Sequence, residues 1–280
     1  MKKRWFLSLL ISFVLLFYLG KLPFFYTLRS YILMPIYDLG IVKSSTLHQK
    51  GIRFYIPDGS QTPERDWYPY MLHHNGSEAF SQYIGKKVSL DILYDFGHFD
   101  FWKGSSSFYD LDSPYCGAFY GGYAVFTHDS HWMYGFDQEG TPMMDELSQV
   151  PSFDQTHLVL PSVGLSSDQV TFRYQVKDVQ YNQSYMGYNG WVKIDADIET
   201  NAPIHQRDHV NYPGYYQYGL PHPPWFPGVN YPVIILKGRT YVRYFAEYGG
   251  TFFLYVMAQD ENTLNKCDQQ LLSAASITSK

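Results

Sequence analysis

The clearest pattern in the chain is an alternation of apolar and polar positions in its second half. Residues 170–179 and 191–199 place an apolar side chain at nearly every second position, with polar or charged residues between them. A period of two predicts β-strands that have one buried face and one face in water. The dipeptide Asn189-Gly190 has the composition of a turn and is expected to connect these two strands.

Two more strands are expected near the C-terminus, followed by a helix. Residues 239–248 and 251–258 flank Gly249-Gly250, a sequence typical of a hairpin turn. After them the apolar spacing lengthens to that of a helix. Asp260 is expected to cap the N-terminus of this helix, and its apolar stripe, which includes Cys267, is expected to face the sheet.

The first half of the chain has a weaker pattern. It predicts strands at residues 88–96 and 118–127 and short helices at residues 77–84 and 143–149. Because no repeat or linker divides residues 41–280, we expect them to form one domain. The predicted fold class is α+β, an antiparallel sheet with the C-terminal helix packed on it, preceded by an N-terminal transmembrane helix.

The N-terminus has the pattern of an export signal. Lys2, Lys3 and Arg4 precede an uncharged run, residues 5–20, which would be about 24 Å long as a helix. The run ends in bulky residues, so we expect an uncleaved signal-anchor within residues 1–40; a cleaved signal, and hence secretion, is the alternative. The positive flank places the body outside the cytoplasm, on a single-pass anchor. A buried helix of a soluble protein is the third interpretation.

Composition and charge narrow the classes of function. Aromatic residues make up 19% of the 280 residues and charged residues 17%, which is typical of a folded protein. The first 30 residues hold five basic side chains and no acid, so the remainder has 16 basic against 26 acidic residues, a formal charge of −10. Nucleic-acid binding depends on basic surfaces and is therefore not expected. No motif indicates a cofactor.

Cys116 and Cys267 are the two cysteines of the chain. In an oxidising compartment, an even pair without C-x-x-C spacing favours one structural disulfide. Two separate buried thiols are the alternative.

Residues 104–172 contain nine acidic side chains and no lysine or arginine. This asymmetry predicts a negative surface, with a solvated acidic face and a Ca²⁺ site as the two interpretations. Within the stretch, His128 and His131 lie three residues apart and Asp137 follows, so these three are candidate metal ligands. The longer H-E-x-x-H pattern of catalytic zinc sites and the G-x-S-x-G motif of serine hydrolases are both missing from the sequence.

Residues 201–232 form a stretch rich in proline, glycine and aromatic residues. A long aromatic loop of this kind can stack on sugar rings, lie at a lipid headgroup interface, pack on a protein partner, or cover an open part of the sheet. The candidate ligand-binding residues are Tyr215, Tyr216, Tyr218, His222, Trp225 and Phe226.

These patterns together predict a membrane-anchored extracytoplasmic protein that binds envelope polysaccharide or another membrane protein through the aromatic loop. One alternative is an exported hydrolase or metal-dependent enzyme that uses His128, Asp129, His131 or the histidines of residues 205–222. The other is an accessory subunit of a membrane complex.

Overall fold

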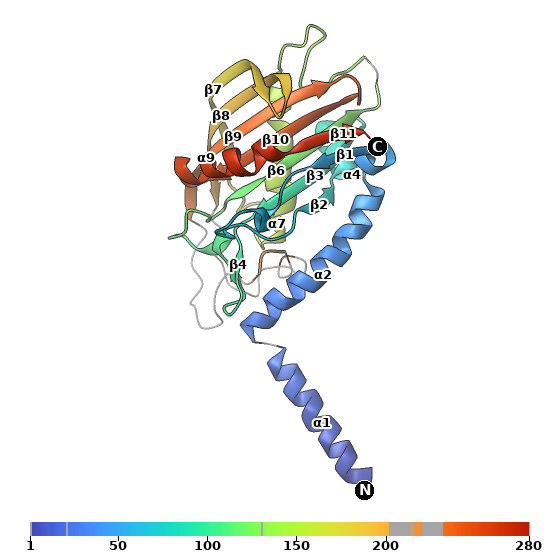
Figure 1. Cartoon of the computed structure of the whole chain (residues 1–280), viewed down its shortest axis with the longest axis vertical. Helices are drawn as coiled ribbons and strands as arrows, with labels where there is room; N and C mark the ends of the chain where they lie inside the picture. Colours follow the sequence, from blue (N-terminus) through green and yellow to red (C-terminus); the bar gives the residue numbers. More distant parts are fainter. Residues whose placement is uncertain are drawn as a thin grey trace.

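The computed structural model describes residues 2–20, 22–129, 131–201, 214, 217–219 and 232–279 (Figure 1). Its centre is an antiparallel sheet of seven strands. In spatial order these are β2 (Leu72–Asn75), β3 (Val88–Phe96), β6 (Phe119–Thr127), β10 (Gly250–Ala258), β9 (Val233–Phe245), β8 (Tyr188–Asn201) and β7 (Phe172–Tyr185). The prediction of an α+β fold with an antiparallel sheet is confirmed.

Three adjacent strands of the sheet, β3, β6 and β10, are buried along almost their whole length. Along β10, Phe253 and Tyr255 enter one hydrophobic cluster, whereas Phe252 and Leu254 enter a second cluster on the opposite face. A strand that is apolar on both faces needs a covering layer on each side. The rest of the chain supplies these two layers.

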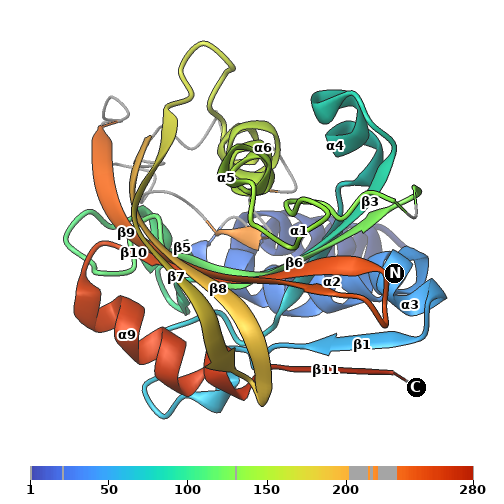
Figure 2. The same ribbon diagram turned by 90° about the horizontal axis from the view of Figure 1, so that it is seen from above.

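Figure 2 shows the two layers on opposite sides of the sheet. One layer consists of α9 (Glu261–Gln270) and the small sheet of β1 (Ile52–Tyr55) and β11 (Ser276–Ser279). The other consists of α4 (Ser77–Ile84), α5 (Met144–Leu147), α6 (Gln149–Phe153), the π-helical turn η3 (Asp154–Val159) and α7 (Leu160–Ser162). The remaining short elements are α3 (Thr46–Gln49), η1 (Gly59–Gln61), β4 (Phe99–Asp100), β5 (Ser105–Ser106), η2 (Ser107–Tyr109) and η5 (Leu272–Ala274).

Several elements lie where the pattern predicts them. The helix expected at residues 77–84 and the strand expected at residues 88–96 coincide with α4 and β3. The Asp260 carboxylate caps α9 by accepting a hydrogen bond from the Thr263 amide at 2.8 Å. These elements depend on local patterning and capping, which the sequence displays directly.

The turn expected at Asn189-Gly190 is wrong. Strands β7 and β8 are longer than predicted and turn at Met186 and Gly187, which have φ angles of 53° and 77°. A type I′ hairpin turn needs positive φ at both positions, and of these two residues only Gly187 is suited to it by composition. Asn189 and Gly190 lie inside β8.

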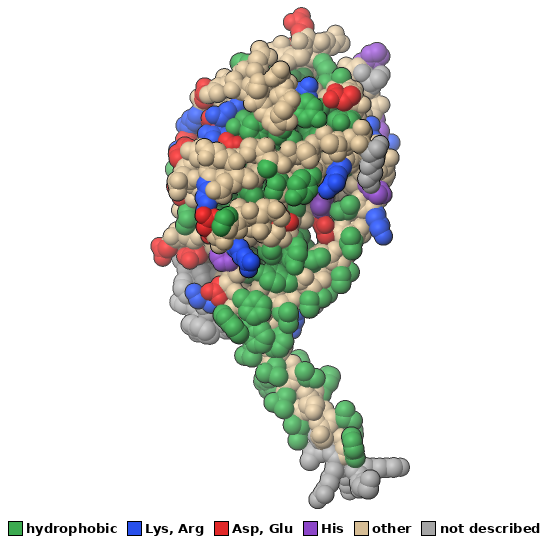
Figure 3. All heavy atoms as spheres, in the orientation of Figure 1, with side chains coloured by type: hydrophobic (Ala, Val, Ile, Leu, Met, Phe, Trp, Pro, Cys, Tyr) green, Lys and Arg blue, Asp and Glu red, His purple; other side chains and the backbone are tan. Residues whose placement is uncertain are grey.

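The N-terminal segment forms two helices, α1 (Lys2–Leu19) and α2 (Pro23–Ser44). No single described helix is long and apolar enough to cross a membrane, whereas the pair Ser8–Leu19 and Pro23–Ser44, bent by 87°, meets the requirements of length and composition together. The side chains of α1 are largely hydrophobic and uncovered by the body (Figure 3). The single transmembrane helix remains a prediction.

Helix α2 packs on the body, so the predicted boundary at residue 40 falls inside a helix that contacts the sheet. It lies along the edge strand β2 and buries Thr27, Ser30 and Met34. The hydroxyl groups of Ser30 and Tyr68 are hydrogen-bonded at 2.6 Å. An edge strand exposes unpaired backbone groups, and α2 covers this one.

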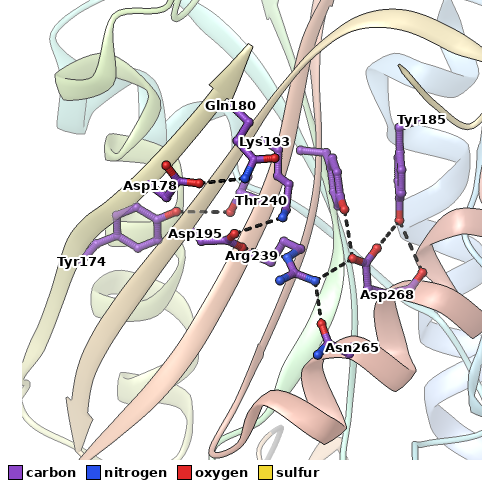
Figure 4. A network of polar contacts seen from close by, with 11 residues as sticks. Tyr174, Asp178, Gln180, Tyr185, Lys193, Asp195, Arg239, Thr240, Asn265 and Asp268 are labelled. Atoms are coloured by element: carbon purple, nitrogen blue, oxygen red, sulfur yellow. Dashed lines mark hydrogen bonds and ion pairs between the residues drawn. The ribbon is translucent and has the colours of Figure 1, made fainter. Parts of the chain in front are cut away.

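A polar network attaches α9 to the sheet (Figure 4). The Arg239 guanidinium on β9 contacts Asp195 of β8 at 2.7 Å and Asp268 of α9 at 3.0 Å. The Asp268 carboxylate also accepts hydrogen bonds from the hydroxyls of Tyr185, at 2.5 Å, and Tyr241, at 2.9 Å. Each charge in this network has partners, as a structural network requires.

The predicted disulfide is wrong, because Cys116 and Cys267 are both free and buried. Cys116 lies in a turn before β6, against Ile234 of β9. Cys267 faces the sheet from α9, as predicted, and lies in the hydrophobic cluster beneath that helix, which does not include Cys116. Burial raises the pKa of Cys116 to about 12 and that of Cys267 well above its ordinary value, so both are inert thiols at neutral pH.

We therefore expect the non-reduced protein to react with two equivalents of a thiol reagent after denaturation and with almost none while folded, since both sulfur atoms are buried. Thiol titration with and without denaturant measures this. An unfolded, non-reduced chain without reactive thiols would contradict the structure.

Candidate functional site

A cavity of about 250 Å³ opens between the helical layer and the sheet, and it is the candidate site. Its wall is built from α2, β2, β3, the η3–α7 segment and residues 217–218. The side chains that determine its chemistry are Tyr37, His74, Tyr94, Asp154, His157 and Tyr218.

Asp154 is placed by an irregularity in the helical layer. Helix α6 continues directly into the π-helical turn η3, which begins at Asp154. π-Helical turns are rare in proteins as a whole, but many of those that occur lie at functional sites, because they change the direction of the side chains that follow. Here Asp154 is only 3% exposed, and its carboxylate accepts a hydrogen bond from the Tyr123 hydroxyl of β6 at 2.8 Å.

The Asp154 carboxyl is electrostatically perturbed. Burial raises its pKa to about 7, and the hydrogen bond from Tyr123 only partly opposes this effect. None of the ion pairs between described residues includes Asp154. The group therefore exchanges its proton near neutral pH, which is a property of acid–base and ligand-binding groups.

Tyrosine hydroxyls surround the carboxyl. Tyr94 of β3 and Tyr218 both line the cavity beside Asp154, together with Ser162 of α7. Burial raises the pKa of Tyr94 and of Tyr218, so both hydroxyls stay protonated. Behind them, Tyr123 and Tyr255 stack with their ring centroids 4.6 Å apart.

Two histidines complete the wall. Burial lowers the pKa of His74 on β2, which favours its neutral form. The His157 ring stacks on Phe153 with centroids 5.2 Å apart, and its Nδ1 lies 2.8 Å from the Thr156 hydroxyl oxygen. With tyrosine hydroxyls and a neutral imidazole around one titrating carboxyl, the cavity can bind a polar ligand that carries little charge.

Tyr218 is the one predicted ligand-binding residue that the structure describes. It lines the cavity, yet it is only 2% exposed. Its ring packs on Phe96 and Phe108, with centroids 4.7 Å and 5.5 Å away. Tyr218 thus offers the cavity its hydroxyl while its ring belongs to the core.

The other predicted ligand-binding residues lie outside the described residues, so their role stays a prediction; these are Tyr215, Tyr216, His222, Trp225 and Phe226.

The predicted metal ligands His128, His131 and Asp137 are not brought together. Within the described part of the chain, no three His, Cys, Asp or Glu side chains form a group that could hold a metal ion. The Asp137 carboxylate accepts hydrogen bonds from the Glu139 amide at 2.9 Å and the Thr141 amide at 2.8 Å, which hold its pKa below the ordinary value. Asp137 therefore closes a loop of its own backbone.

A second cavity, of about 380 Å³, lies between α2, β1 and β2 and is mainly apolar. At its rim, the Asp38 carboxylate accepts a hydrogen bond from the His73 amide at 2.6 Å and contacts the His73 Nδ1 at 2.9 Å. Because these two groups satisfy each other, they are poorly placed to orient a ligand. The Asp154 cavity has more convergent polar groups and is the better candidate.

The sequence pattern did not identify Asp154, Tyr94 or His74 as site residues. Asp154 counted only as one of nine acids in residues 104–172. One signal was present: Asp154 follows Val150 and Phe153 in a helical stretch, where an acid on the apolar stripe is unexpected.

Asp154 should make folding depend on pH. Its pKa is higher in the folded protein than the ordinary 3.8, so the folded state holds the proton after the unfolded chain has lost it. The free energy of unfolding then falls as pH rises from about 4 to about 7 and is constant above. From about pH 5 to about pH 8, the free energy of unfolding of the wild type should fall by about 2–3 kcal/mol more than that of Asp154→Asn, at ~1.4 kcal/mol per pKa unit.

Urea unfolding of both proteins at the two pH values measures this difference. Asp145→Asn, on the exposed surface of α5, controls for the change in net charge. Parallel pH profiles for the wild type and Asp154→Asn would rule out a titrating Asp154.

Comparison with known proteins adds no relative: the chain matches no family model, no curated protein and no solved structure. The chemistry of the Asp154 cavity is therefore the basis on which a function is assigned.

Proposed function

We propose that this protein is a membrane-anchored extracytoplasmic binding module whose ligand site is the Asp154 cavity. The observation that carries the proposal is the convergence of Tyr94, Tyr218 and His74 on a buried carboxyl in a concave space. A buried acid without a cationic partner lowers stability, so its place in a cavity wall favours a role in binding.

The ligand class follows from the chemistry of the wall. None of the described residues that line the cavity is lysine or arginine, so an anionic ligand would find no counter-charge. The formal charge of −10 on residues 31–280 also repels anions. The tyrosine hydroxyls at the cavity wall suit the hydroxyl groups of a sugar. We therefore propose a neutral saccharide, such as one unit of an envelope polysaccharide.

Membrane attachment is supported by the N-terminal segment. Basic residues 2–4 begin α1, and the described apolar side chains that follow them are exposed along the helix, for example Trp5 at 71%. A helix with uncovered apolar side chains is unfavourable in water and favourable in lipid. The positive N-terminus favours an orientation with the body outside the cytoplasm.

Binding is tested with N-acetylglucosamine oligosaccharides by calorimetry and with insoluble cell-wall polysaccharide by co-sedimentation. Tyr94→Phe and Tyr218→Phe should each weaken binding about tenfold, the effect of losing one hydrogen bond of ~1.4 kcal/mol. Tyr255→Phe is the matched control, because this buried hydroxyl has no partner among the described residues and does not line the cavity.

If Tyr94→Phe and Tyr255→Phe bind these saccharides equally well, the Asp154 cavity is not the binding site. Failure of the wild type to bind any of them would remove the saccharide from the proposal.

The orientation is tested by adding protease to intact cells that express the full chain. Protease should degrade the body and leave a membrane fragment that contains α1, since the body is proposed to lie outside. A soluble product that begins near Lys21 would replace anchoring by secretion. A body protected until the cells are lysed would contradict the orientation.

An exported hydrolase is the second candidate function, and the pKa of Asp154 favours it. A carboxyl with a pKa of about 7 is suited to general acid–base catalysis. Such a hydrolase would cleave the same oligosaccharides, and Asp154→Asn would abolish cleavage while leaving their binding within about tenfold. A binding module leaves the oligosaccharides intact.

A further inference from the structure

Hydrophobic side chains gather at the end of the body from which α1 leaves (Figure 3). We call Phe24, Phe25, Phe101 and Trp102 the basal aromatic cluster. The Phe24 ring, in the first turn of α2, lies 6.3 Å from the Phe101 ring and 6.1 Å from the Trp102 ring. Phe101 is 40% exposed and Trp102 is 75% exposed. Side chains of this size are seldom so exposed together without a binding role.

The turn that carries Phe101 and Trp102, between β4 and β5, is held firmly. The Asp100 carboxylate accepts hydrogen bonds from the amides of Trp102, at 3.0 Å, and Lys103, at 2.9 Å. Gly104 has a φ of 66°, and a side chain there would collide with the carbonyl oxygen of Pro23. The turn is therefore fixed against the start of α2, and the exposure of Trp102 follows from a defined backbone.

The cluster is continuous with the apolar surface of the N-terminal helices. Figure 1 shows β4 at the same end of the body as the junction of α1 and α2. Across this junction, the Arg29 guanidinium of α2 donates a hydrogen bond to the Gly20 carbonyl oxygen at 2.6 Å. Leu22 and Leu28, which flank Phe24 and Phe25 in sequence, are also exposed. One apolar surface thus extends from α1 onto the body.

We propose that the basal aromatic cluster inserts into the headgroup region of the same bilayer that holds α1, and so docks the body on the membrane. Tryptophan rings concentrate at this depth, and phenylalanine side chains are among those that interfacial segments bury there. The proposal rests on the anchoring of α1 in a membrane and adds a second contact, made by a hairpin far from α1 in sequence.

The test uses the full chain in nanodiscs of phosphatidylcholine and phosphatidylglycerol. Lys103→Cys places a fluorophore beside Trp102 and keeps all four rings, while Cys116 and Cys267 are buried and escape labelling. Tyr181→Cys, on the exposed edge strand β7, is the matched control. With spin-labelled lipids, the label at position 103 should lose at least about half of its emission, because it would lie at headgroup depth. The label at position 181 should lose almost none.

Adding Trp102→Ala to the Lys103→Cys chain should reduce the lipid quenching at least twofold, because a main anchor of the hairpin is removed. The proposal is overturned if aqueous iodide quenches the labels at positions 103 and 181 equally in nanodiscs. It is also overturned if the label at position 103 is shielded from iodide without lipid quenching, which would mean that a second copy of the chain covers the cluster. A chain that does not enter nanodiscs at all would instead disprove the anchoring by α1.

Discussion

The fold depends on covering both faces of three adjacent strands of the sheet. Nearly every residue of β3, β6 and β10 is buried, so neither face of the sheet is in water at its centre. Gly121 and Gly122 of β6 allow this close packing, because a side chain at these positions would collide with the Leu93 backbone or the Phe54 ring. Helix α9 and the β1–β11 pair therefore cover one face, and the helical layer covers the other.

The candidate site arises where the helical layer departs from regular helix. In the turn η3, the Asp154 side chain faces the sheet. The neighbouring positions that face the same way carry the apolar residues Val150, Phe153 and Val159 of the core. The contrast with Asp268 is informative, since that buried carboxylate has a guanidinium and two tyrosine hydroxyls as partners. Asp154 has a tyrosine but no cation among the ion pairs of the described chain. A fold gains no stability from such an acid, which is the pattern that functional sites show.

The sequence predicted those elements whose cause is local. The strand at residues 88–96, the helix at residues 77–84 and the Asp260 cap depend on neighbours within a few positions, and all three are present. The disulfide and the Asp154 site depend on distant contacts. Tyr123, which bonds to Asp154, is 31 residues away in sequence, and nothing in the local pattern indicates that pairing. The prediction of a turn at Asn189-Gly190 was wrong for a related reason, because the position of the turn depends on the register between β7 and β8.

Helix α2 connects the proposed membrane contact to the proposed binding site. Its first turn supplies Phe24 to the basal aromatic cluster, and Tyr37, about 20 Å further along the helix, lines the Asp154 cavity. The Ser30–Tyr68 bond, between these two points, and the Asp38–His73 bond, just beyond Tyr37, hold the same helix on the body. A body held by α1 alone could rotate on its anchor. If the cluster is inserted as well, α2 sets both the distance of the cavity from the lipid and the direction in which it faces.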